Sequence, residues 1–218
     1  MSQKQLENQQ YTIQKWVTFL LFAIVYTTVY YGRFAMLYHI ETIEQSLGIA
    51  EDIEGYVYSA VMLSYAIGSV FTGRWADMLH RPIILILLGT GVSFLTNILL
   101  VFVNSWRGLI FLSVLNGFFQ SMIWVSGIQL VAMWWKSAQR PLSGGILNFF
   151  SGIAHIPAFF LPGMILLTSH DRAVIQKNYS FILIICTLLL FFFLIASDHP
   201  QKAGLSHYTE DNEIIAGR

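Results

Sequence analysis

Charged residues are scarce in this chain. They make up 11% of its 218 positions, whereas hydrophobic residues make up 56% and the mean hydropathy is +0.61. A soluble domain carries about 25% charged residues, so the chain lacks the polar surface that water requires. The formal net charge of zero excludes a strongly basic nucleic-acid-binding protein. These shortages predict an all-α integral membrane protein embedded in the lipid bilayer.

Cysteine is almost absent as well. The single Cys186 lies in an apolar run, which excludes disulfide bonds within the chain and cysteine metal sites. A cleavable signal peptide is not expected, because the apolar run after Lys15 is longer than a signal-peptide core of about 7 to 15 residues. We expect neither a metal nor a cofactor, and no enzymatic activity.

Six segments are apolar enough to cross a bilayer, which takes about 20 residues per helix. They comprise residues 16–38, 55–72, 83–103, 108–133, 142–167 and 179–196. The expected organisation is therefore a tail over residues 1–15, a six-helix bundle over 16–196 and a second tail over 197–218.

Basic residues predict the orientation, because cytoplasmic loops carry the excess of lysine and arginine. If the amino terminus is inside, the outer side holds three basic residues, Arg107, Arg172 and Lys177. The inner side then holds eight, which are Lys4, Lys15, Arg74, Arg81, Lys136, Arg140, Lys202 and Arg218. We expect a multi-pass protein of the inner, cytoplasmic membrane with both termini in the cytoplasm.

Small or polar side chains recur at helical spacing on four of these segments. Spacings of three and four residues place each set on one helix face, and such a face must meet protein or a water-filled cavity within the membrane. The second segment carries a small-residue packing face, formed by Ala60, Ser64, Gly68 and Thr72. The other faces are Tyr26, Tyr30 and Arg33; Ser113, Asn116, Gln120, Trp124 and Gly127; and Gly144, Gly145, Asn148, Ser151, Gly152 and His155.

These three polar faces predict a substrate site near the middle of the membrane, where transporters of this size bind their cargo. For Asn148 and Gly152, packing between helices is an equal alternative. His155 lies near the middle of its segment, and we expect it to line a cavity.

Arg33 is the basic residue inside the first span. A buried arginine is costly and needs a partner, yet the six spans contain no aspartate or glutamate. The forked guanidinium matches two oxygens of a phosphate or carboxylate, so Arg33 predicts an anion site. The alternative is that Arg33 extends to the outer interface.

The lack of membrane carboxylates also bears on energetics. Without an acid to carry protons, exchange of one anion for another is favoured over proton coupling. His155 is the one intramembrane group expected to titrate near neutral pH.

The loop after the second span, Gly73-Arg74-Trp75-Ala76-Asp77 followed by Arg81, resembles the signature loop of the major facilitator superfamily. The resemblance implies an amino-terminal half of that fold, built as a 3+3 inverted repeat. It also implies that Asp77, Arg74 and Arg81 lock an inner gate.

Within that superfamily, the fourth span resembles the organophosphate:phosphate antiporters through Phe119-Gln120, Met122, Trp124 and Trp134-Trp135. The resemblance implies that Arg33 binds substrate phosphate and that Asn148 follows the pattern of the fifth span. The family histidine falls on Ser151, one turn before His155. Two basic positions of the family are Phe34 and Gln129 here.

The resemblance covers nearly the whole chain and about half of a twelve-helix transporter. We therefore expect a second six-helix half, on a separate chain or beyond this one, and no transport by this chain alone. A sugar-phosphate sensor is an alternative. A six-helix intramembrane protease is another, because Ser126 and His155 could pair, although the motif around Ser126 differs from that family's.

Overall fold

The chain folds into long α-helices. In the computed structural model, the described residues are 3–38, 48, 53–100, 102–103, 105–166. Over these ranges the structure contains no strand and has five α-helices with one short 3-10 turn, which are α1 (Gln3–Tyr38), α3 (Ile53–Leu79), α4 (Pro82–Leu100), α5 (Trp106–Trp134), η1 (Ser137–Gln139) and α6 (Arg140–Leu166). The expected span 179–196 and the tail 197–218 lie outside the described residues.

Four segments of the described chain are long and apolar enough to cross a membrane, namely Gln9–Phe34, Pro82–Leu100, Trp106–Trp134 and Ser137–Phe160. The expectation of a multi-pass, all-helical membrane protein is thereby confirmed. Helix α3 is also long enough, with 27 residues, but its many Gly, Ser and Tyr residues dilute its apolar ones.

Helix α1 begins at Gln3, not at Trp16 as the hydropathy predicts. The polar residues before Trp16 are good helix formers. They are also held in place, because the buried Tyr11 donates a hydrogen bond of 2.5 Å from its hydroxyl to the carbonyl of Trp134. With 36 residues, α1 is about 54 Å long, so it extends well beyond the ~30 Å hydrocarbon layer.

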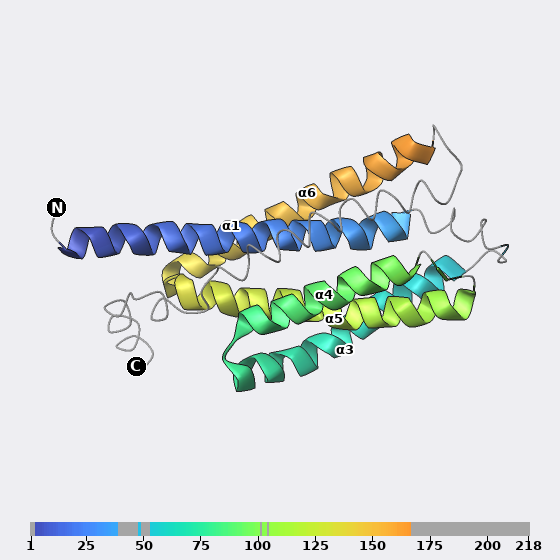
Figure 1. The fold of residues 1–218 in the computed structure, drawn as a ribbon, viewed down its shortest axis with the longest axis horizontal. Helices are drawn as coiled ribbons and strands as arrows, with labels where there is room; N and C mark the ends of the chain where they lie inside the picture. Colours follow the sequence, from blue (N-terminus) through green and yellow to red (C-terminus); the bar gives the residue numbers. More distant parts are fainter. Residues whose placement is uncertain (1–2, 39–47, 49–52, 101, 104, 167–218) are drawn as a thin grey trace.

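Helix α5 packs along both α3 and α4, while α1 lies along α6 (Figure 1). Glycines allow α3 and α4 to approach α5 closely. A Cβ atom at Gly68 of α3 would lie 2.8 Å from the carbonyl oxygen of Phe118, and one at Gly89 of α4 would lie 2.6 Å from that of Phe119. The small-residue face predicted on α3 is confirmed, because Ser64, Gly68 and Thr72 are buried.

The α1–α6 pair is packed differently. Its buried contacts include those of Tyr31 of α1 with Ala154 and Ala158 of α6. Leu147 of α6 is fully buried in a cluster with residues of α1. A Cβ atom added at Gly144, Gly145 or Gly152 would meet no atom within 4 Å in the described part of the chain. No described residue therefore packs against these three glycines of α6.

Candidate functional site

Arg33 lies at the boundary between these two groups of helices. Its side chain is 5% exposed, and its Nε donates a hydrogen bond to the side-chain oxygen of Gln120 on α5. A charged group is this well buried only where polar partners or a ligand stabilise it. The structure thus places together two residues that the sequence predicted as site residues on separate helices.

A chain of hydrogen bonds fixes the orientation of Gln120. Its Nε2 donates to Oδ1 of Asn116 at 3.0 Å, and the same oxygen accepts a 2.6 Å hydrogen bond from the hydroxyl of Ser93 on α4. Asn97 in turn donates to the carbonyl of Ser93 at 2.7 Å. Because Asn116 occupies the amide nitrogen of Gln120, the amide oxygen is directed at Arg33. The polar network therefore runs from α1 through α5 to α4.

Two tyrosine rings cover the guanidinium of Arg33. Its central carbon lies 4.6 Å from the ring centroid of Tyr65 on α3 and 5.2 Å from that of Tyr30 on α1, within the range of cation–π attraction. Sequence analysis predicted Tyr30 but missed Tyr65. The available signal was Tyr58 and Tyr65, which lie two helical turns apart on the second segment.

Two further aromatic residues predicted for the site, Tyr26 and Trp124, lie beside Tyr30. We call Tyr26, Tyr30 and Trp124 the aromatic wall. The ring of Tyr26 lies 4.5 Å from that of Tyr30 and stacks on Trp124 at 5.0 Å, with an angle of 26° between the planes. Tyr26, Tyr30 and Trp124 therefore form a continuous aromatic surface between α1 and α5. A surface of this kind can stack against the ring of an organic ligand.

The predicted residues of α6 lie in a different place. His155 packs on the ring of Phe34 at 3.8 Å, and Phe34 lies 5.7 Å from Tyr30. Asn148 is exposed, and the hydroxyl of Ser151 donates to its backbone carbonyl at 2.8 Å. His155 thus approaches the aromatic wall through Phe34, whereas Asn148 and Ser151 make no contact with the Arg33 network within the described residues.

The charge on Arg33 is not neutralised by any carboxylate of the described residues. Its terminal Nη1 and Nη2 groups likewise have no hydrogen-bond acceptor there. The described chain also has no cluster of three or more residues that could hold a metal ion. The described residues therefore leave the two terminal N–H groups of the guanidinium without an acceptor.

The residues expected to form a gate are placed at one end of α3. Arg74, Asp77 and Arg81 are all exposed, and no ion pair joins these three described residues. Between them, His80 adopts a left-handed backbone with φ of 50°, which ends the helix. The hydrogen bond that does tie this end of α3 to α5 runs from Gln129 to the carbonyl of Ala76, at 3.1 Å.

The arrangement expected of an intramembrane protease is not present. Ser126 is fully buried, and its hydroxyl has no hydrogen-bond partner among the described residues. His155 packs on Phe34. Since a nucleophilic serine needs a hydrogen-bonded base, Ser126 and His155 do not form a catalytic pair.

Long apolar helices around a buried polar cluster define a multi-pass membrane protein. A family model described as Major Facilitator Superfamily matches residues 18–215. The chain belongs to the major facilitator superfamily, which places it among membrane transporters, as the signature loop predicted. No curated protein matches the chain.

Proposed function

We propose that this transporter carries an organic anion, such as a sugar phosphate or glycerol phosphate, in exchange for inorganic phosphate. Arg33 is the group that binds the phosphoryl oxygens. The observation that carries the proposal is the state of its side chain, which is buried and held through Nε by Gln120. Among the described residues, no acceptor occupies its two Nη groups, which suit a bidentate interaction with an anion.

The surroundings of Arg33 favour an anion over a cation or a neutral solute. The hydrogen-bond network behind it, made by Gln120, Asn116 and Ser93, is uncharged and leaves the positive charge to a ligand. The partly exposed rings of Tyr30 and Trp124, which pack against the buried Tyr26, suit the carbon skeleton or ring of the same ligand. Sugar phosphates combine both chemical features.

The same surroundings favour exchange. The four candidate spans contain no aspartate or glutamate, so a proton-coupled cycle would have no carboxylate to use. When one anion replaces another at Arg33, its charge is neutralised in both directions of transport. The anionic ligand thereby supplies the negative charge that a membrane carboxylate supplies in proton-coupled transport.

The proposal includes a topology and a partner. Both termini lie in the cytoplasm, as the eight inner and three outer basic residues favour, and residues 1–15 and 197–218 flank the membrane bundle. A second six-helix half, on this polypeptide or another, completes the transport path. Alternating access needs two such units that move around the site.

Exchange in native membranes tests the function with any second half retained. Membrane vesicles from cells carrying the wild-type chain are loaded with labelled phosphate, and glycerol 3-phosphate or glucose 6-phosphate is added outside. We expect label efflux that Arg33→Lys lowers at least about tenfold, because lysine keeps the charge but loses the fork. Arg107→Lys is the matched control, since Arg107 is exposed beside Trp106. Substrate binding without any efflux from wild-type vesicles would instead support a sensor.

A further inference from the structure

Helix α4 is linked to Arg33 of α1 through two side chains of α5. The hydroxyl of Ser93 on α4 donates to Oδ1 of Asn116 at 2.6 Å, and the same oxygen accepts from Nε2 of Gln120 at 3.0 Å. Gln120 in turn accepts from Nε of Arg33. We call Ser93, Asn116 and Gln120 the relay. Each of the three is at most 3% exposed, so water does not compete for these hydrogen bonds.

The relay has one direction, which Arg33 determines. Nε of Arg33 can only donate a hydrogen bond, so Gln120 presents its amide oxygen to it. The amide nitrogen of Gln120 then needs an acceptor, and Oδ1 of Asn116 supplies it. A reversed Gln120 amide would place donor against donor at Arg33 and acceptor against acceptor at Asn116, which is costly in a buried site. The oxygen of Asn116 therefore keeps Gln120 in the orientation that holds Nε.

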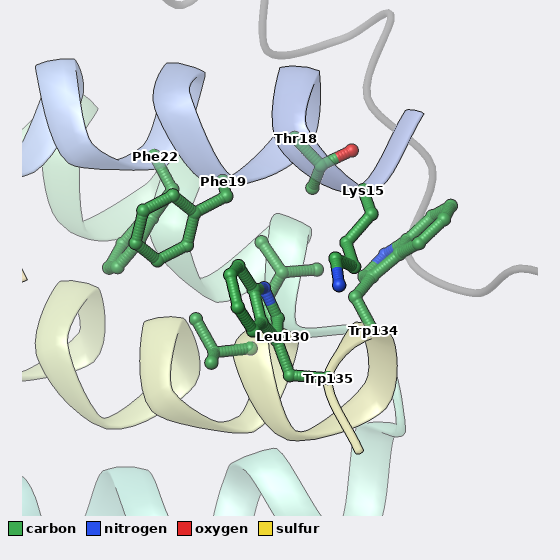
Figure 2. A pocket seen from close by; sticks show the side chains of 8 residues that line it. Lys15, Thr18, Phe19, Phe22, Leu130, Trp134 and Trp135 are labelled. Atoms are coloured by element: carbon green, nitrogen blue, oxygen red, sulfur yellow. The ribbon is translucent and has the colours of Figure 1, made fainter. Parts of the chain in front are cut away.

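Other contacts around α1 do not supply this constraint. Farther along the α1–α5 contact, Phe22 of α1 packs with Leu130 of α5 in one apolar cluster (Figure 2). Apolar packing is non-directional, so it holds the helices together without orienting a guanidinium. The rings of Tyr30 and Tyr65 lie 5.2 Å and 4.6 Å from the central carbon of Arg33, and cation–π attraction to a ring face does not select one nitrogen of the guanidinium. The hydrogen bond at Nε selects one.

We propose that Ser93 and Asn116 are positioning residues for anion binding, which raise the affinity of Arg33 for its ligand without contacting that ligand. This inference rests on the proposed function, in which the Nη groups of Arg33 bind phosphoryl oxygens. Because the relay holds Nε before the ligand arrives, the guanidinium loses less conformational freedom on binding, and the affinity is higher. Ser93 extends this control to α4.

The vesicle exchange assay tests the relay when the external concentration of glycerol 3-phosphate is varied. Asn116→Leu is expected to raise the half-saturating concentration about fivefold. Its maximal efflux per folded transporter should stay within about twofold of the wild type, because the relay acts on binding. Ser93→Ala keeps Asn116 but removes the donor behind it, and we expect a rise of about threefold. Circular dichroism measures the folded amount of each variant.

Thr90→Val is the matched control on α4. Thr90 is as buried as Ser93, and its hydroxyl donates to the carbonyl of Ile86 in the same helix at 2.7 Å. Its half-saturating concentration should equal that of the wild type. Equal rises in Thr90→Val and Ser93→Ala would overturn the proposal, because any buried hydroxyl of α4 would then have the same effect.

The order of the relay gives a second readout. Gln120→Leu already cuts the relay, so adding Asn116→Leu should change the half-saturating concentration by less than about twofold. Ser93→Ala answers the same question if that double variant does not fold. A shift as large as in the single variant would show that Asn116 acts independently of Gln120, and the proposal would be wrong. Unchanged affinity in both single variants, with normal wild-type exchange, would overturn the positioning role alone. Wild-type vesicles without any efflux would overturn the proposed function and this inference together.

Discussion

The α3–α4–α5 group and the α1–α6 pair differ in how closely their backbones approach. In the first group, Gly68, Gly89 and Gly117 lie directly against atoms of a neighbouring helix, and Thr72 shares a 3.1 Å hydrogen bond with Ser121. In the second, Gly144, Gly145 and Gly152 have open space around them among the described residues. The first group is therefore a closely packed scaffold, whereas no described residue packs against these three glycines of α6.

Arg33 lies where these two groups meet. Helix α1 carries the charge, and Gln120 of α5 and Tyr65 of α3 supply its partners from the scaffold. A binding site at such a boundary can sense or drive relative movement, because a ligand that contacts both sides changes the stability of their arrangement. The glycines of the first group therefore hold the scaffold together, whereas Arg33, Gln120 and Tyr65 contact one another across the boundary.

The largest expected effect breaks the scaffold. Gly117→Ala would drive a methyl group into the carbonyl oxygen of Val61 and the hydroxyl of Ser64, and the free energy of unfolding should fall by about 3 kcal/mol. Gly145→Ala on α6 is the matched control, with no change or a gain of up to about 1 kcal/mol. Thermal unfolding of both variants in detergent measures the difference. Equal destabilisation would remove the distinction between the two groups.

The next effect concerns the boundary itself. Gln120→Leu removes the acceptor of Arg33, so the buried Nε of Arg33 is left unsatisfied at a cost of about 2 kcal/mol. Asn116 loses one donor but keeps its hydrogen bond from Ser93. The free energy of unfolding in detergent should fall, and the affinity for glycerol 3-phosphate should fall as well. Ser151→Ala is the control, because that hydroxyl bonds only within its own helix. Unchanged binding in Gln120→Leu would show that the network does not position Arg33.

A smaller effect is expected at the end of α3. Gln129→Leu loses the hydrogen bond to Ala76, so we expect a loss of about 1 kcal/mol of stability. Asp77→Asn should change stability by less than about 0.5 kcal/mol, since Asp77 is exposed and has no ion pair with another described residue. Chemical unfolding would compare the two. If Asp77→Asn lost more stability than Gln129→Leu, the expected gate residues, and not the hydrogen bond of Gln129, would hold the end of α3 against the bundle.

Sequence periodicity predicted the faces of individual helices well. Tyr26, Tyr30 and Arg33 share one face of α1, Gln120 and Trp124 share one face of α5, and the structure brings these two faces together. Periodicity reports which side chains lie on one side of a helix. Periodicity was sufficient to predict Arg33 and Gln120 as site residues, because the polar faces of α1 and α5 meet through their buried hydrogen bond.

Other features could not be read from periodicity. Tyr65 and Ser93 enter the site because α3 and α4 both pack on α5, and which helices become neighbours depends on tertiary packing. The early start of α1 was missed because hydropathy reports membrane burial, whereas Tyr11 stabilises the helix outside that layer. The resemblance to the signature loop identified the superfamily. It did not predict that Arg74, Asp77 and Arg81 are all exposed.

The most direct measurement is the affinity of glycerol 3-phosphate for the purified full chain, compared by titration calorimetry between wild type, Arg33→Lys and the exposed control Arg107→Lys. If the buried guanidinium of Arg33 binds the anion, Arg33→Lys weakens binding at least about tenfold and Arg107→Lys leaves it unchanged. If Arg33 only extends toward the membrane surface, both variants bind like the wild type, and the anion site does not exist.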